Sequence, residues 1–132
     1  MNVVLDTNVL VSALLTPHGP PARVLDLALS GSVRVAYDDR ILDEYRSVLR
    51  RERFRFDPAA VADLLAYLQS SGLHVTAPPQ SPLRADASDQ AFFEVAMAGA
   101  DALITGNLKH FPLTAGHASV ISPARFLARL WR

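Results

Sequence analysis

The chain has 132 residues, half of them hydrophobic, which is typical of one globular domain with a buried core and excludes a disordered chain. Its 13 Lys and Arg balance 13 Asp and Glu, so the whole molecule has no net attraction to nucleic acid, and the absence of cysteine excludes disulfides and thiol nucleophiles. No apolar run reaches the ~20 residues of a membrane-spanning helix, and we expect residues 1–132 to form a single domain without a signal peptide in the reducing cytoplasm.

Short β-rich runs alternate with helical patterns along the chain. In order, we expect a strand over 2–5, a helix over 8–15, a helix ending near 30, a strand over 33–36, a helix over 40–53, a helix from Pro58 to about Gly72, a strand over 73–76, a helix over 88–98, strands over 102–105 and 119–121, and a C-terminal helix from Pro123. The proline-rich segment 77–85 is expected to be a loop. This alternation predicts an α/β fold with five strands in a mainly parallel sheet.

Asp6 directly follows the first expected strand, at a place where burial is expected. A buried carboxylate is costly unless it is paired or holds a metal. An ordinary alternative is a helix cap, but Thr7 and Asn8 are better placed to cap a helix that starts near Val9. Asp6 is therefore expected to have a functional role at the carboxyl ends of the strands, where sites of open parallel sheets form.

The helix over 40–53 carries two adjacent acidic residues, Asp43 and Glu44. Its apolar face is formed by Ile41, Leu42, Tyr45, Val48 and Leu49. At 3.6 residues per turn, Glu44 lies on the edge of this face, whereas Asp43 points nearly the opposite way and is expected to be solvated. Glu44 is thus the one that can reach an internal site, and the alternative is a surface partner of neighbouring polar residues.

Two more carboxylates, Asp86 and Asp89, lie at the start of the helix over 88–98. There they could simply cap the helix and complement its dipole. Glu94, further along, is a less compelling candidate. Asn107 follows the strand over 102–105 and is expected at the same sheet edge as Asp6, if the strands are parallel.

This edge would collect Asp6, Glu44 and Asp89, with Asp86 and the amide of Asn107 as further members. Clustered carboxylates cannot all ionise cheaply without a cation. Mg²⁺ and Mn²⁺ prefer such oxygen ligands, activate water and stabilise the leaving oxygen of a phosphodiester. Zinc is not indicated, because there is no thiol and the four histidines show no ligand spacing, so each is taken as a surface or core residue.

At these residues the chain resembles the PIN-domain family. The similar segments are VVLDTNVLVSALL, ILDEYRSVLRR, DASDQAFFEVA, ADALITGNLKHF and the terminal VISPARFLARL. They cover nearly the whole chain, and the nearest group comprises VapC-related toxin components of toxin–antitoxin systems. The resemblance implies a three-layer α/β/α fold and an endoribonuclease that depends on Mg²⁺ or Mn²⁺.

The resemblance also implies roles for individual residues. Asp6, Glu44 and Asp89 match the three acidic metal-site residues, with Asp86 expected to act through water. The residues that match supporting polar positions are Thr7, Asn8 and Thr105. We expect these carboxylates to hold one cation that activates a water for in-line attack on an RNA phosphate.

Two positions depart from the family pattern. Asn107 stands where many members have a fourth acid, and His110 stands where some have an aspartate. An amide can ligate through its oxygen but carries no charge, which weakens a second metal site. Asn107 therefore motivates an alternative, a catalytically weak or inactive scaffold that binds RNA or a protein partner.

Two other enzyme classes share parts of the pattern. A receiver-like phosphoacceptor domain needs an Asp after a central strand, but Asp38 and Asp39 are expected to be helix caps. A dehalogenase-type phosphatase needs a second Asp two residues after the first, where Asn8 stands.

Partners follow mostly from the resemblance, which implies an RNA substrate, a cognate antitoxin protein and a homodimer. The arginines that could follow the RNA backbone are Arg46, Arg50, Arg51, Arg53 and Arg55. Their alternative is a solvated helix end that complements the dipole. The terminal FLARLW either packs on the sheet or places Trp131 in an interface.

Overall fold

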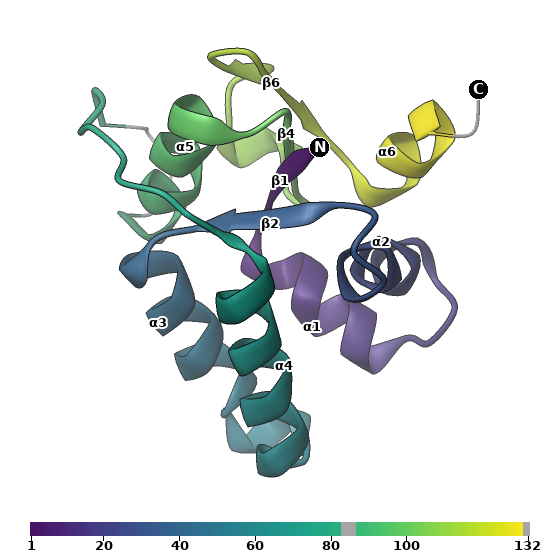
Figure 1. Ribbon diagram of the computed structural model, residues 1–132. Helices are drawn as coiled ribbons and strands as arrows, with labels where there is room; N and C mark the ends of the chain where they lie inside the picture. The colour runs from purple at the N-terminus through teal and green to yellow at the C-terminus, as the bar shows by residue number, and fades with distance from the viewer. Residues whose placement is uncertain (83–86, 131–132) are drawn as a thin grey trace.

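The computed structural model describes residues 1–82 and 87–130 (Figure 1). Within these ranges, one sheet contains β1 (Asn2–Leu5), β2 (Arg34–Tyr37), β3 (Leu73–His74), β4 (Ala102–Ile104), β5 (Thr114–Ala115) and β6 (Ala118–Ile121), in the order β3-β2-β1-β4-β6-β5. Neighbouring strands are parallel except β5 and β6. The α/β prediction is confirmed.

The sequence predicted five strands where residues 1–82 and 87–130 hold six, because it missed β5. β5 is only two residues long and pairs antiparallel with β6. Gly116 in the connecting turn has φ +62°, which glycine adopts without steric cost. A two-residue strand is too short to show any hydrophobic period.

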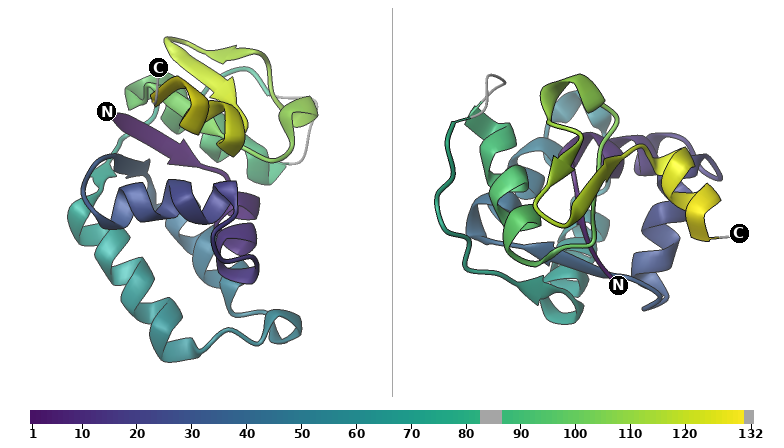
Figure 2. Two further views of the ribbon diagram at one scale, coloured as in Figure 1. Left: turned by 90° about the vertical axis from the view of Figure 1, so that its right-hand side faces the viewer. Right: turned by 90° about the horizontal axis from the view of Figure 1, so that it is seen from above.

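Helices cover both faces of the sheet. α1 (Thr7–Leu15), α2 (Pro20–Leu29), α3 (Asp39–Leu49) and α4 (Pro58–Ser71) lie on one face, and α5 (Ala87–Gly99) lies on the other (Figures 1 and 2). The chain steps from β1 to β2 to β3 in one direction and then returns to β4, so right-handed crossovers place α5 opposite the first four helices. α6 (Pro123–Leu130) packs against α2.

Prolines begin one helix, and another helix ends earlier than expected. Pro20 and Pro21 lie inside the first turn of α2, where their fixed φ and missing N–H are tolerated. α3 ends at Leu49 instead of continuing to residue 53, and a short 3-10 turn, η1 (Glu52–Phe54), follows. The apolar spacing that buries α3 stops at Leu49, because the next four residues are all charged.

The core lies between the sheet and the two helical layers. Val3, Val4 and Leu5 of β1 are completely buried, as expected of a central parallel strand. Phe126 and Leu127 of α6 are also buried, so this part of the C-terminal apolar segment packs inward. Asp86 and Trp131, which the sequence singled out, lie outside the described residues.

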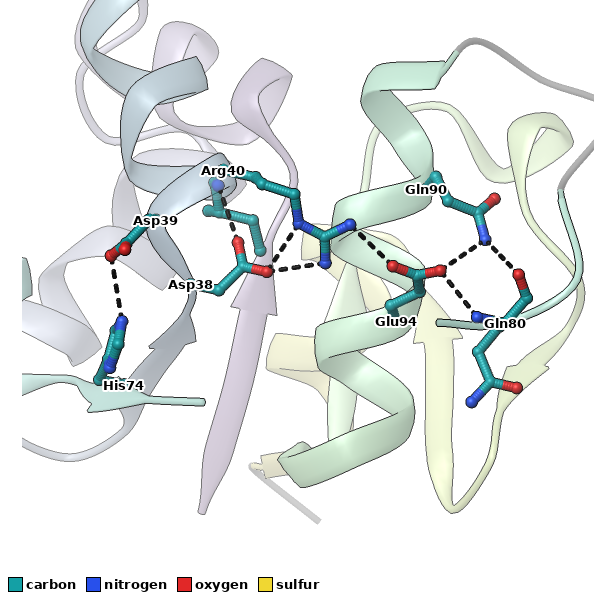
Figure 3. A network of polar contacts seen from close by, with 8 residues as sticks. Asp38, Asp39, Arg40, His74, Gln80, Gln90 and Glu94 are labelled. Carbon is teal, nitrogen blue, oxygen red and sulfur yellow. Dashed lines mark hydrogen bonds and ion pairs between the residues drawn. The ribbon is translucent and has the colours of Figure 1, made fainter. Parts of the chain in front are cut away.

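A buried carboxylate, Glu94, joins α5 to the opposite layer (Figure 3). It accepts hydrogen bonds from Arg40 Nη1 at 2.7 Å, from the Gln80 N–H at 2.8 Å and from Gln90 Nε2 at 3.0 Å. Arg40 also pairs at 2.7 Å with Asp38, whose side chain caps α3. The network fixes the start of α3, the segment around Gln80 and α5 relative to one another.

Glu94→Gln is expected to lower the free energy of unfolding by about 1–3 kcal/mol at pH 7, because Arg40 loses one of its two charged partners. Burial raises the pKa of Glu94, but the Gln80 N–H, the Gln90 amide and the Arg40 guanidinium outweigh it and hold the pKa below its usual range. The stabilisation is therefore present above the unfolded pKa of about 4.3 and is lost as pH falls through the folded-state pKa.

Thermal unfolding at pH 7 and at pH 3 checks this expectation. The difference in melting temperature between the wild type and Glu94→Gln should close on acidification. Glu52→Gln, which changes an exposed carboxylate in η1, serves as the control. A difference that stays constant with pH would show that the charge of Glu94 contributes nothing.

Candidate functional site

Asp6 lies at the carboxyl end of β1 and is 6 % exposed. α1 begins at Thr7, so Asp6 occupies the N-cap position, but its side chain makes no capping hydrogen bond. Its Oδ2 instead accepts hydrogen bonds from Thr105 Oγ1 at 2.7 Å and from Asn8 Nδ2 at 3.2 Å. The expectation that Thr7 or Asn8 caps α1 is wrong, because both lie inside the helix, but the Asp6 side chain is indeed not used as a cap.

The turn after β4 meets Asp6 at the same edge of the sheet, as parallel pairing of β1 and β4 requires. Thr105 is completely buried, and its hydroxyl also accepts a hydrogen bond from the Asn107 N–H at 2.9 Å. Asn8 Oδ1 accepts one from the Gly106 N–H at 3.1 Å. The structure therefore brings Asp6, Asn8, Thr105 and Asn107 together, and these contacts fix the orientation of the Asp6 carboxylate.

Asp89 in the first turn of α5 is 7 % exposed and interacts electrostatically with Asp6. Burial raises the pKa of Asp6 most, and the negative charge of Asp89 raises it further. The Thr105 hydroxyl, the Thr7 N–H and His110 act in the opposite direction without cancelling the rise. Two buried carboxylates that repel each other are stabilised by a shared cation.

His110, which the sequence predicted to be a surface or core histidine at a position where some family members have an aspartate, lies at the site. Its Nδ1 lies 3.1 Å from Asp89 Oδ2. It ends η2 (Leu108–His110), a 3-10 turn that was not expected and that carries His110 back toward α5. No spacing pattern could have indicated this contact, because it joins two segments through the fold alone.

Glu44 approaches the same edge from α3. It is half-buried and lines a cavity of about 280 Å³ together with Thr7 and Asn8. The neighbouring Tyr45 donates a hydrogen bond of 2.5 Å to the carbonyl of Leu5, which ties α3 to the end of β1. This hydrogen bond joins α3 to β1 at the residues that directly neighbour Glu44 and Asp6.

The helical phase predicted for Asp43 and Glu44 is confirmed. The Asp43 side chain is 76 % exposed and pairs with Arg46 at 2.9 Å on the surface of α3. Arg46 lies in the last turn of α3, Arg50 is its C-cap and Arg51 follows it, so these arginines lie at the carboxyl end of the helix. Arg51 lines the same cavity as Glu44.

The donors at this edge are suited to a hard divalent cation, although they do not form a complete cage. Among the described residues, no three His, Asp or Glu side chains are close enough to form a ready metal cluster. Asp6 and Asp89 are close enough to interact electrostatically, and Glu44 lines a cavity with Thr7 and Asn8. The Thr7 hydroxyl is buried and has no hydrogen-bond partner among the residues that the structure describes. Oxygen donors, repelling carboxylates and an unsatisfied hydroxyl fit Mg²⁺ or Mn²⁺ with retained waters.

Comparison with known proteins gives one family. A model of the PIN domain matches residues 2–109. No curated protein and no solved structure matches significantly. None of the helices in the described ranges combines the length and the apolar character needed to cross a bilayer.

Proposed function

The chain belongs to the PIN domain family, whose members are generally nucleases that need divalent metal ions, and on this premise we propose that it is an endoribonuclease dependent on Mg²⁺ or Mn²⁺. The observation that carries the proposal is the buried, mutually repelling pair Asp6 and Asp89 at the carboxyl edge of the sheet. We propose these two and Glu44 as the ligands of one cation, with Asp86 acting through water. Residues 1–132 would work as one domain in the cytoplasm.

A divalent cation bound there supplies a lowered pKa for water and charge stabilisation for the phosphodiester. The chain itself orients the ligands. Thr105 and Asn8 hold Oδ2 of Asp6, and His110 holds Oδ2 of Asp89. Arg51 lies beside Glu44 and would bind a phosphate of the RNA backbone. No side-chain nucleophile is required. Asn107 is neutral, so it adds no negative charge that would help to bind a second cation.

Cleavage of an unstructured RNA with Mg²⁺ or Mn²⁺, and its loss in EDTA, tests the proposal. The adjacent acids of α3 offer a matched pair of variants. Glu44→Gln should lower kcat/KM by about 100-fold, because it removes a ligand charge, whereas Asp43→Asn should stay within about two-fold. Equal activity of the two variants would show that Glu44 is not a ligand of the metal ion.

We further propose that the protein is the toxin of a type II toxin–antitoxin system, a homodimer that a small antitoxin blocks. The segments similar to VapC-related toxins support this, from VVLDTNVLVSALL to TGNLKHF. Induced expression should arrest growth of a bacterial host, and co-expression of the neighbouring small reading frame should restore it. Normal growth with active enzyme in the cell would contradict a toxin role.

The neutral Asn107 favours a second candidate, a scaffold that binds RNA or a protein without cleaving it. Mn²⁺ titration of the nuclease assay separates the two candidates. A scaffold would bind RNA with the same affinity in EDTA and in Mn²⁺ and would release no product.

A further inference from the structure

The connection between α3 and α4 carries a stack of three side chains, and packing in the hydrophobic core does not account for all of them. It stands out from the body of the molecule in the left panel of Figure 2. The rings of Phe54 and Phe56 are stacked with centroids 5.4 Å apart and an interplanar angle of 13°. The guanidinium carbon of Arg53 lies over the Phe54 ring, 4.8 Å from its centroid. Phe56 packs against the core, but Phe54 is not among the hydrophobic residues that do.

Backbone strain accompanies this stack. Arg55, between the two phenylalanines, has φ 54°, a left-handed conformation that is costly for any residue except glycine. Arg55 is the C-cap of η1, so the chain leaves the 3-10 turn at this residue, between the two rings. The turn brings Phe54 onto Phe56, which is itself anchored at the core.

The stack lies beside the proposed catalytic edge. Arg53 and Phe54 line the cavity of about 280 Å³ that Glu44 and Asn8 also line. Asn8 is shared with a second hollow of about 200 Å³, which reaches Asn107. A third hollow of about 400 Å³ continues from Asn107 to Lys109 and His110. The three hollows therefore share lining residues in succession near the carboxyl ends of β1 and β4.

We propose that Arg53, Phe54 and Phe56 form a stacking platform for one unpaired base of the RNA, next to the phosphate that is cleaved. The platform rests on the proposed nuclease function. A guanidinium over an aromatic ring is held in place by the cation–π contact, and both groups stack readily on nucleobases. Arg51, two residues earlier and on the same cavity, is placed to bind the adjoining phosphate.

Selectivity for single strands follows from this chemistry. In a duplex, neighbouring bases cover both faces of every base, so a platform can be reached only by a base that has left its stack. Recognition by stacking tolerates many sequences, because every base has a π face. The substrate class is therefore single-stranded or looped RNA, and one stacked base fixes where the RNA strand lies on the protein.

Binding in EDTA tests the platform without cleavage. Fluorescence anisotropy would compare the wild type, Phe54→Leu and Arg53→Lys on a labelled unstructured RNA and on the same strand in a duplex. Phe54→Leu should weaken single-strand binding by about 5- to 100-fold, the range of one lost base stack. Arg53→Lys, which keeps the charge and loses the plane, should weaken it by a smaller factor, and duplex binding should not change. Arg129→Lys, on the exposed side of α6, is the matched control.

Abasic substitutions along the RNA provide the second measurement. One abasic position should weaken binding to the wild type and have no further effect on Phe54→Leu, because the same stack is lost in both. Equal losses on single strand and duplex, or an abasic effect that persists in the variant, would overturn the platform. Melting temperatures of the variants show that an observed loss does not come from unfolding.

The two proposals fail in different ways. If the wild type cleaves single-stranded RNA with Mn²⁺ while Phe54→Leu keeps its kcat/KM and its affinity, the platform is wrong and the nuclease stands. If the wild type shows the abasic pattern but never cleaves, the nuclease is wrong and the platform stands. No binding to any RNA would overturn both.

Discussion

Asp6→Asn is expected to lower RNA cleavage by at least about 1000-fold and, in the absence of metal, to raise the melting temperature. Activity falls because the proposed cation site loses its most buried charge. Stability rises because the folded protein holds Asp6 in a place where ionisation is unfavourable. Burial and the charge of Asp89 both raise its pKa.

The pH dependence of this effect follows from the sign of the shift. Because the folded-state pKa of Asp6 is raised, its ionisation costs stability as pH rises from the unfolded value of about 3.9 through the folded-state value. The gain from Asp6→Asn in EDTA should therefore be largest at pH 7 and disappear toward pH 3. An amide oxygen can still accept the hydrogen bond that Thr105 donates.

Thermal unfolding with and without Mn²⁺ adds a further distinction. Mn²⁺ should raise the melting temperature of the wild type and leave that of Asp6→Asn unchanged, since a ligand stabilises only the state that binds it. Asp26→Asn, an exposed acid in α2, is the control and should behave as the wild type does. A lower melting temperature of Asp6→Asn in EDTA at pH 7 would contradict the electrostatic explanation.

Thr105→Val is expected to lower the free energy of unfolding by about 1–3 kcal/mol and kcat/KM by about 10- to 100-fold. Valine has nearly the same shape but no hydroxyl. The fully buried hydroxyl donates to Asp6 and accepts from the Asn107 N–H, so its removal leaves both groups without that partner. It also removes an interaction that lowers the pKa of Asp6.

Thr105→Ser separates the hydroxyl from the methyl group. Serine keeps both hydrogen bonds and loses one buried methyl, so it should lose only about 0.5–1.5 kcal/mol and keep activity within a few-fold. Urea unfolding and initial rates on the three proteins measure the two effects. Equal activity of the valine and serine variants would show that the hydroxyl does not position Asp6.

Local sequence pattern predicted much of this edge. The apolar period of α3 separates Glu44 from Asp43, and the structure places one on a cavity and the other in solvent. Asp6 and Thr105 are 99 residues apart, yet parallel strands carry both to one edge once β1 and β4 are paired. These features depend on the apolar period of a helix and on the direction of the strands, and both can be inferred from the sequence.

Contacts that depend on how loops fold could not be predicted in the same way. His110 reaches Asp89 through a 3-10 turn that has no apolar period. Glu94 is buried in contact with Arg40, 54 residues earlier, and with the Gln80 N–H, which no local pattern brings to it. The early end of α3 at Leu49 creates the segment that carries Phe54, whereas the sequence suggested continued helix.

A crystal structure with Mn²⁺ tests most directly whether Asp6 anchors a divalent cation. The expected result is an anomalous peak bonded to the carboxylates of Asp6 and Asp89, with Glu44 bound directly or through a water, and no such peak in Asp6→Asn. An Mn²⁺ peak only at exposed acids such as Asp43, or none at millimolar Mn²⁺, would contradict a metal site at this edge and with it the proposed nuclease mechanism.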